Sequence, residues 1–571
     1  MLIQPNRVAH KASATLLHRA HPPTRRLVFL LVGVLLVAAA LRLALLATDA
    51  FTFNSDEAIV ALMARHIREG RELPIFFYGQ AYMGSLDAIL VSLGFALFGE
   101  SVLTIRLVQS VLYLGVVAST FWLGWRLTRS AWAAAVAALL VAVPPTLMTL
   151  YTTATLGGYN ETLLLGNLLL ILGYAVTHGH EASRWRWALM GALAGLGWWT
   201  NGLIAAYLLP VGLLILRRFS LAQLPRYALA FCLFMLFSAP WWQYNFTHNN
   251  AALAIFFPSL KTEQKLVAGY ESVPLEQRVV GLLLFALPAV VGARFPWEAG
   301  FFGLPLSPLI PGIYVALLYH WLRRGAPRMN GRGRVLLLLT TGNLCLIFLI
   351  SPFGADPTGR YFLPLIAPLA VLTAATFHQL RPMRPLLAIG AVILLLAFNL
   401  LGNGVAAVRQ PPGLTTQFDP ISHIPHKHDQ ELMDFLYAHN LTRGYANYWV
   451  AFRLAFLSGE RIILRAALPY KADLSYNPAD DRYAPYREAV SRADNVGYVT
   501  ANHPVLDEII RQRMAERGVS FAEQQIGPYR VFYDLSERVT PHELGLDSLA
   551  GGRAHAHALR NYSVGGWSDA G

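Results

Sequence analysis

Long apolar stretches separated by short polar segments dominate the first 408 residues of the chain. The first stretch, Leu27–Ala47, holds about 20 residues, which is the length a helix needs to cross a bilayer. Because the apolar core of a cleavable signal peptide is shorter, we interpret it as a retained first span. Ten further candidate spans follow it: Val102–Trp125, Ala131–Leu150, Thr162–Val176, Trp187–Trp199, Leu203–Leu216, Tyr227–Trp242, Leu306–Leu322, Val335–Ile350, Phe362–Phe377 and Leu386–Val405.

Two other apolar stretches, Leu86–Phe98 and Val279–Val291, hold about 13 residues each. They are too short to span, so we expect them to lie in the interface or to re-enter the membrane. Arginine clusters between the spans test the count, because cytoplasmic loops are enriched in Lys and Arg. With eleven spans the clusters share the side of the basic N-terminus, which makes that side cytoplasmic. Thirteen spans are the alternative, and both counts place the C-terminus outside.

The pattern changes after Val405. From Arg409 the chain is polar, and its prolines indicate a linker. Alternating helical and strand patterns then predict a small α/β domain. Its expected helices are Asp429–His439, Val450–Leu457, Arg482–Ala493 and Pro504–Gly518, and its expected strands are Arg443–Tyr448, Arg461–Arg465, Val496–Ala501 and a final hairpin of Val519–Gln525 with Tyr529–Leu535.

The predicted fold class is therefore an α-helical polytopic membrane protein with a small C-terminal α/β extracytoplasmic domain. The expected organisation is a basic cytoplasmic N-terminus (1–26), a membrane domain (27–408) with an outer loop (48–85), a linker (409–428), the soluble domain (429–535) and a disordered tail (536–571).

Composition supports this class. Hydrophobic residues make up 55% of the 571 residues and charged residues 14%, whereas soluble proteins carry about 25% charged residues. The net charge of +13 comes from arginines clustered between apolar stretches, which is typical of membrane loops and not of nucleic-acid binding. Both cysteines, Cys232 and Cys345, lie in apolar stretches, so no disulfide framework is expected.

The first outer loop begins with Asn54-Ser-Asp-Glu57, directly after the first span. A carboxylate at the membrane surface can act as a general base, because the low-dielectric boundary raises its proton affinity. Asp56 and Glu57 are therefore candidate catalytic residues. The alternative is ordinary capping of the helix that follows, with Ser55 or Asp56 as the cap.

Other polar residues are expected near the same outer face. Asn160 and Glu161 begin a later span, where Glu161 either faces the outer cavity or only favours the helix dipole. Arg360, beside Tyr361, can bind a phosphate or snorkel to the headgroups. Arg42 lies inside the first span, where a charge is by default a functional candidate, and Arg106 is a weaker case.

Metal and nucleotide motifs are weak. His423, His426 and His428 lie in a Pro-rich segment with no nearby cysteine, which gives little support for a metal site. No phosphate-binding Gly-rich loop falls between a strand and a helix. Carboxylates and arginines at one face suit instead a substrate with a lipid tail, a phosphate and a polar head.

The layout resembles the GT-C superfamily of glycosyltransferases, in particular protein O-mannosyltransferases and bacterial lipid A aminoarabinose transferases. Asp56-Glu57 matches the acidic residue that those families carry after the first span. Gly158-Tyr-Asn-Glu161 is similar to the second acidic loop of oligosaccharyltransferases. Gly195-Leu-Gly-Trp-Trp-Thr-Asn-Gly202 resembles another shared stretch, and Arg360-Tyr361-Phe-Leu-Pro364 matches an Arg-Tyr segment.

Two positions depart from the resemblance. Ala81-Tyr-Met-Gly-Ser85 stands where relatives carry a Pro-Pro pair, so Gln80, Tyr82 and Asp87 are the substrate-binding candidates of that segment. Asn201 stands where a Lys is usual, so Arg42 or Arg360 is expected to bind the phosphate instead.

The resemblance implies an inverting transfer of a sugar from a polyprenyl phosphate to an acceptor hydroxyl at the outer face of a bacterial inner membrane. The acceptor is a glycan, a lipid or a protein. No cofactor is expected, although a divalent cation near Glu161 stays open, and no nucleic acid takes part. The alternatives are a flippase for lipid-linked glycans, which would carry charges deep in several spans and broken helices, and a non-catalytic assembly protein.

Overall fold

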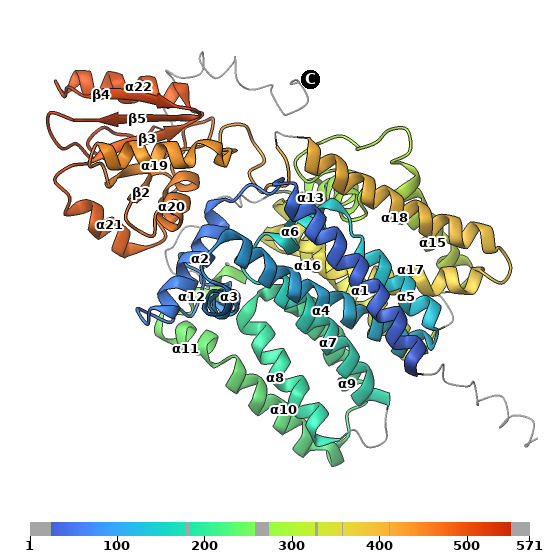
Figure 1. Cartoon of the computed structure of the whole chain (residues 1–571). Coiled ribbons are helices and arrows are strands. Elements are labelled where there is room, and N and C mark those ends of the chain that lie inside the picture. Colours follow the sequence, from blue (N-terminus) through green and yellow to red (C-terminus); the bar gives the residue numbers. More distant parts are fainter. Residues whose placement is uncertain are drawn as a thin grey trace, which may run out of the picture.

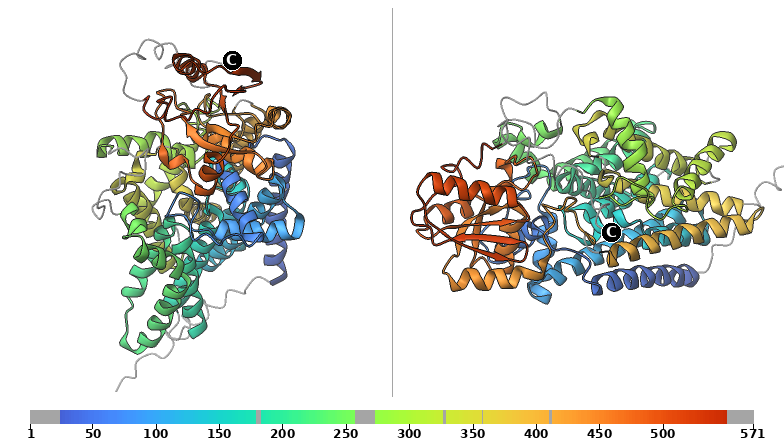
Figure 2. Two further views of the ribbon diagram at one scale, coloured as in Figure 1. Left: turned by 90° about the vertical axis from the view of Figure 1, so that its left-hand side faces the viewer. Right: turned by 90° about the horizontal axis from the view of Figure 1, so that it is seen from above.

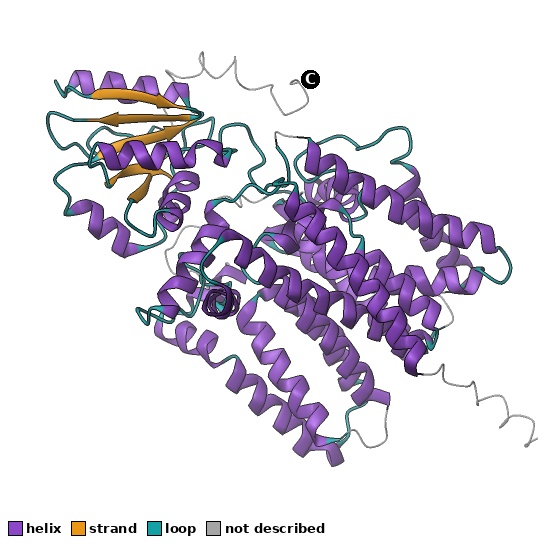
Figure 3. Cartoon of the chain, in the orientation of Figure 1, coloured by secondary structure: helices purple, strands orange, loops and turns teal. Residues whose placement is uncertain are grey.

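The computed structural model of the chain describes residues 24–178, 183–256, 273–325, 329–356, 358–409 and 412–549. A bundle of apolar helices makes up the larger part, and a small domain with a sheet sits at one end of it (Figure 1). Every strand of the described residues belongs to that domain (Figure 3). The basic segment expected to be cytoplasmic lies almost wholly outside the described residues.

Within the described residues, six helices are long and apolar enough to cross a membrane, or up to eight if each of two bent pairs is one span. The chain is thus a multi-pass membrane protein. The six are α1 (Thr24–Ala47), α4 (Val102–Thr128), α7 (Tyr159–His178), α16 (Gly331–Ile350), η7 (Arg360–Leu365) with α17 (Ile366–Leu380), and α18 (Pro385–Val408).

The other predicted spans are helical too. The bent pairs are α5 (Ala131–Ala142) with α6 (Thr146–Thr153) and α10 (Leu224–Phe237) with α11 (Ala239–Thr247), and three shorter helices are α8 (Arg184–Thr200), α9 (Ala205–Leu216) and α15 (Leu309–Arg324). All eleven predicted stretches therefore fold as helices, although α8, α9 and α15 hold only 17, 12 and 16 residues.

Proline causes the sharper bend. The axes of α5 and α6 differ by 72°, and the break holds Pro144 and Pro145, which lack the N–H that would continue a helix. Two amides of α18 bind the carbonyls freed there: Asn399 donates to Val143 O at 2.9 Å and Asn403 to Pro144 O at 2.8 Å. The bend is thus held in place, and it directs α6 across the end of the bundle.

The ends of α4, α7 and α16 meet on the side of the bundle away from the C-terminal domain. Asn330 donates its backbone N–H to Leu127 O at 3.1 Å and contacts His178 Nε2 at 2.7 Å. Arg332 donates to Thr177 O at 2.6 Å. Loops that carry basic clusters therefore lie at one end, as the eleven-span count requires.

The two short apolar stretches also fold as helices, but in different ways. The first is α3 (Leu86–Phe98), and the second is divided into α13 (Leu275–Val280), the π-helical η5 (Gly281–Ala286) and α14 (Leu287–Val290). Another short helix, α12 (Ala251–Phe256), follows α11. None of them is long enough to cross the membrane.

The C-terminal domain has the expected elements in the expected order. Its strands are β1 (Arg443–Asn447), β2 (Ile463–Leu468), β3 (Gly497–Ala501), β4 (Ala522–Ile526) and β5 (Tyr529–Tyr533), and its helices are α19 (Asp429–Ala438), α20 (Tyr448–Leu457), α21 (Ala484–Ser491) and α22 (Pro504–Glu516). The strand order is β2-β1-β3-β5-β4. β1 is parallel to β2 and β3, and β5 is antiparallel to β3 and β4, so the predicted final hairpin is confirmed.

The C-terminal domain rests on α2 (Ser55–Arg68), the helix of the first loop (Figure 2). The apolar and charged positions of this helix have the amphipathic spacing that is typical of a helix lying on the membrane, but Ser55 and Glu57–His66 are buried in protein. Phe456 of α20 stacks at 5.6 Å from Phe53 and at 6.1 Å from Phe95 of α3. One continuous apolar core therefore joins the first loop to the domain.

A buried polar cluster fixes the same contact. His66 of α2 approaches Glu460 at 3.0 Å, and Tyr486 and Arg71 donate to the same carboxylate at 2.9 Å each. Although burial raises the pKa of Glu460, the bonds from His66 and Tyr486 and the charge of Arg71 bring it down to about 2. Glu460 is thus an anion that ties α2 to the domain.

The segments flanking the C-terminal domain are packed. Leu414, in the expected linker, pairs with Phe51 just after α1, so the ends of α1 and α18 lie on the same side of the bundle. Of the tail expected to be disordered, residues 536–549 are described, and Val539, Leu544 and Leu546 are buried. The rest of that tail lies outside the described residues.

The number of spans predicts on which side of the membrane each loop and the C-terminal domain lie. We expect a reporter fused after Arg334 to read cytoplasmic and one fused after Gln410 to read external, because basic loops stay in the cytoplasm. Alkaline phosphatase and fluorescent protein fusions measure this. Two cytoplasmic readings would remove the C-terminal domain from the outer face and contradict the assignment.

We expect Glu460→Gln to destabilise the contact between α2 and the domain by about 1–3 kcal/mol, since it leaves buried donors poorly matched. The melting temperature of the purified protein, followed by tryptophan fluorescence, should fall, while exposed Glu537→Gln should leave it unchanged.

Acid should weaken the contact that Glu460 makes between α2 and the C-terminal domain. The pKa of Glu460 lies below its ordinary 4.5, at about 2, so the stabilisation is present above pH 4.5 and is lost as pH falls toward 2. An equal loss of stability on acidification in wild type and Glu460→Gln would contradict this role.

Candidate functional site

A cavity of about 800 Å³ lies where the bundle, the first loop and the C-terminal domain meet. Its polar and aromatic lining comes from all three parts. These lining residues include Asp56, Gln80 and Tyr82 from the first loop, Tyr151, Tyr159, Asn201, Asp356, Arg360 and Tyr361 from the bundle, and Tyr448, Trp449, Tyr470, Asn477, Asp480 and Arg482 from the domain.

Asp56 enters the cavity because a neighbouring residue caps the helix. Asn54 is the N-cap of α2, and its side chain accepts the N–H groups of Asp56 and Glu57. The capping interpretation of Ser55 or Asp56 is therefore wrong. The Asp56 carboxylate is left to interact with the domain: Tyr448 donates its hydroxyl to Oδ1 at 2.5 Å, and Arg482 Nη1 lies 3.9 Å from the same oxygen.

Glu57, the other candidate of the pair, does not line the cavity. Its side chain is fully buried and forms an ion pair with Arg106 at 3.1 Å. Arg106 also donates to Phe51 O at 3.1 Å. Consecutive helix positions point about 100° apart, so one residue faces the cavity and the next one anchors α2 to α4.

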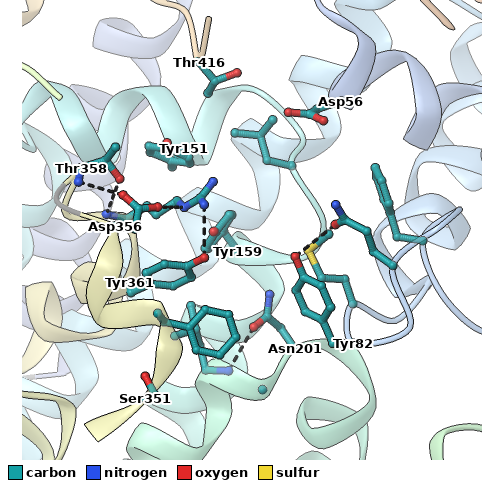
Figure 4. A pocket seen from close by; sticks show the side chains of 18 of the residues that line it. Asp56, Tyr82, Tyr151, Tyr159, Asn201, Ser351, Asp356, Thr358, Tyr361 and Thr416 are labelled. Carbon is teal, nitrogen blue, oxygen red and sulfur yellow. Dashed lines mark hydrogen bonds and ion pairs between the residues drawn. The ribbon is translucent and has the colours of Figure 1, made fainter. Parts of the chain in front are cut away.

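Asp356 and Tyr361 lie across the cavity from Asp56 (Figure 4), and both contact Arg360. Its Nε pairs with Asp356 at 2.7 Å, and its Nη2 donates to the Tyr361 hydroxyl at 3.2 Å. Asp356 in turn accepts the Thr358 N–H at 2.9 Å. About a third of the Arg360 side chain is exposed, so the guanidinium is held in place but stays accessible from the cavity.

The segment between α2 and α3 forms another wall of the cavity. Tyr82 donates to Gln80 Oε1 at 3.2 Å. Met83 pairs with Asn201, which donates its amide to Gly157 O at 3.3 Å. Gln80, Tyr82 and Asn201 thus line the cavity, and Asn201 also connects two loops.

Three candidate residues lie in a buried polar network outside the cavity lining. Asp87 accepts a bond from Gln109 at 2.7 Å and another from Thr155. Asn160 donates to Gln109 Oε1 at 2.7 Å. Glu161 is buried in the same region. The structure therefore brings Asp87, Asn160 and Glu161 together, but apart from Asp56.

Arg42 is also buried, with 3% of its surface exposed. It donates to Thr152 and Thr153 of α6, and its guanidinium lies 3.8 Å from the ring centre of Tyr113. Since Arg42 does not line the cavity, it holds the bent α6 in position and is not placed to reach a phosphate there.

Sequence reasoning missed the residues that the C-terminal domain contributes. Asp480 is 6% exposed, and burial raises its pKa to about 6, opposed by the charge of Arg482. Arg482 lies between the rings of Tyr448 and Phe77, at 4.5 and 5.3 Å. Burial raises the pKa of Tyr448 well above its usual value, so this phenol stays a hydrogen-bond donor.

The histidine cluster of the sequence does not converge. His426 contacts Asp49 at 2.9 Å, His428 contacts Glu431 at 3.0 Å, and burial lowers the pKa of His423 to about 4. Among the described residues, no three His, Cys, Asp or Glu side chains are grouped so that they could hold a metal ion.

No family model matches the sequence, and no curated protein matches it. Solved structures do. ArnT from Cupriavidus metallidurans, bound to undecaprenyl phosphate, has a TM-score of 0.53 at 14% identity over 91% of this chain and 99% of that one. Apo ArnT has a TM-score of 0.56 at the same identity and coverage.

An oligosaccharyltransferase from Archaeoglobus fulgidus is a more distant match, with a TM-score of 0.45 and 14% identity over 87% of this chain and 73% of that one. The match to ArnT extends over nearly the whole of both chains, so it includes the bundle and the C-terminal domain together. The chain therefore shares the overall fold of ArnT.

Proposed function

We propose that this protein is an inverting glycosyltransferase that moves a sugar from a polyprenyl phosphate to an acceptor hydroxyl at the outer face of the membrane. The observation that carries the proposal is the position of Asp56. Its carboxylate lines a cavity that has an apolar side reaching the surface of the bundle and an accessible arginine on the opposite wall.

The apolar side fits a lipid chain. Leu209 of α9 and Ile350 of α16 line the cavity, and they are 51% and 70% exposed on the bundle surface. On a membrane protein such exposed apolar side chains face lipid. A polyprenyl chain can thus pass between the cavity and the bilayer without crossing a polar barrier. The ArnT structure of the same fold holds undecaprenyl phosphate.

Arg360 is the proposed ligand of the donor phosphate. A guanidinium presents paired N–H groups that match two phosphate oxygens. Asp356 and Tyr361 fix the orientation of this side chain. As the bond from the sugar to the phosphate breaks, Arg360 stabilises the negative charge that leaves with the phosphate.

Asp56 is the proposed base. Its Oδ1 is held by Tyr448, and its Oδ2 makes no hydrogen bond or ion pair with a described residue. The acceptor oxygen attacks the anomeric carbon, its proton passes to Oδ2, and the sugar–phosphate bond breaks with its electron pair on the phosphate. A single displacement of this kind inverts the anomeric centre. Tyr448 and Arg482 stabilise the charged carboxylate before the step.

The central prediction concerns Asp56→Asn. Asparagine keeps the size of the side chain and can still accept the bond from Tyr448, but it cannot take a proton. We expect normal folding and a fall in transfer of roughly 10²–10⁴-fold, the usual contribution of a general base. Mass spectrometry of cell-envelope glycans from a complemented deletion strain measures the loss.

Asp49→Asn is the matched control. Asp49 also follows α1, its side chain is 75% exposed, and its backbone is left-handed with a φ of 54°, a conformation that asparagine adopts readily. This variant should restore the glycans. If Asp56→Asn restores them equally well, the base assignment fails, and the bent spans α5–α6 and α10–α11 would favour the flippase alternative.

Glu57→Gln should lower the stability of the folded protein. Without the Glu57 carboxylate, Arg106 is a buried charge with no counter-ion, and removal of one partner of such a pair costs about 3–5 kcal/mol. We expect a lower yield and melting temperature, with residual transfer per folded molecule near wild type. Normal stability with lost transfer would instead move the base to Glu57.

A further inference from the structure

The wall that the C-terminal domain adds to the cavity differs from the rest. The bundle contributes many apolar side chains, whereas the domain contributes aromatic rings, an amide and charged groups. They come from the start of α20 and from the segment between β2 and α21. The aromatic and polar domain residues of this wall, called the domain wall below, are Tyr448, Trp449, Tyr470, Asn477, Asp480 and Arg482.

Trp449 is the centre of the aromatic part. Its ring lies 5.0 Å from Tyr448 and 5.9 Å from Tyr470, both nearly perpendicular to it. The indole Nε1–H is buried and has no hydrogen-bond partner among the described residues. An unpaired buried donor is costly and calls for an explanation. The Nε1 atom is itself closed to the cavity, so a ligand hydroxyl would satisfy it after a small turn of the ring.

Acceptor groups lie on the same wall. Asn477 donates its amide to Asp480 Oδ1 at 3.1 Å, which orients that carboxylate. A carboxylate and an amide together offer several acceptors and donors at fixed positions. Hydroxyl groups, which both donate and accept, are the ligands that match such a set.

The charges of the domain wall disfavour an anionic ligand. Arg482 is 10% exposed and lies 3.9 Å from Asp56, and the charge of Asp480 acts on it as well. Two carboxylates thus balance one guanidinium, which leaves no net positive charge for an anion. A neutral ligand with many hydroxyl groups meets no such repulsion.

We propose that the domain wall is the acceptor subsite and that it binds a neutral carbohydrate. One face of a sugar ring packs on Trp449, the Trp449 N–H, Asn477 and Asp480 bind its hydroxyl groups, and the hydroxyl to be glycosylated points to Asp56. The proposal rests on the proposed function for the role of this subsite in transfer, but the binding itself requires neither the donor nor the reaction.

The test is binding of the purified full-length protein, in detergent and without donor, to arrays of immobilised neutral oligosaccharides, acidic oligosaccharides and Ser/Thr peptides. We expect the wild type to bind neutral oligosaccharides. Trp449→Phe keeps an aromatic ring and removes the N–H, so affinity should fall about tenfold, as for the loss of one hydrogen bond. Asp480→Asn should weaken binding by a similar factor.

Matched controls separate the subsite from general effects. Asp473→Asn changes an exposed carboxylate of the same segment, and Trp185→Phe changes an exposed tryptophan of α8; both should bind as the wild type does. Asp56→Asn should also retain binding while transfer is lost, so failure of the base assignment and failure of the subsite give different results. Melting temperatures verify that each variant is folded.

Three results would overturn the proposal. The first is no binding to any neutral oligosaccharide. The second is stronger binding to acidic oligosaccharides or to peptides. The third is unchanged neutral-glycan binding in folded Trp449→Phe and Asp480→Asn.

Discussion

The apolar contact between α2 and the C-terminal domain is the constraint on which the site depends. Phe456 of α20 inserts beside Phe53 and Phe95, and Arg453 of the same helix donates to Phe53 O at 3.3 Å. This core fixes the helix that carries Asp56 against the helix that carries Tyr448. The two residues are 392 positions apart in the sequence. The hydrogen bond from the Tyr448 hydroxyl to the Asp56 carboxylate therefore forms only while the domain is docked. Docking thus preorganises the proposed base.

The two arginines of the cavity have different environments and hence different roles. Arg482 is packed between aromatic rings, and the carboxylates of Asp56 and Asp480 balance its charge. Arg360 pairs with Asp356 and keeps about a third of its side chain exposed. An incoming phosphate can therefore approach Arg360 without displacing a packed side chain. The arginine proposed to bind the leaving phosphate thus belongs to the bundle, and the arginine beside the proposed base belongs to the C-terminal domain.

The local sequence pattern predicted most of the fold, because the spacing of apolar residues indicates which stretches are helices in lipid and which are strands of a buried sheet. All eleven apolar stretches are helical, and the strands of the domain lie within a few residues of their expected places. The site was only partly predictable. Arg42 and Arg106 drew attention as intramembrane charges, yet their partners Thr152, Thr153 and Glu57 make them structural. No local sequence pattern marked Tyr448, Asp480 and Arg482 as site residues. Their place in the cavity depends on the contact between the C-terminal domain and α2, which the spacing of apolar residues does not indicate.

The two adjacent acidic residues of the first loop have different roles because they point in different directions from α2. Glu57 points into the protein, where its carboxylate is the counter-ion of buried Arg106; if it accepted a proton, that charge would lose its partner at a cost of several kcal/mol. Asp56 points into the cavity, where its closest partner is a neutral phenol that remains a donor whatever the state of the carboxylate. Arg482 lies farther away, at 3.9 Å, and it keeps the charge of Asp480 beside it, so a proton on Asp56 would not leave a buried charge without a counter-ion. The same sequence motif thus supplies an anchor that must stay charged and a neighbour that is free to change.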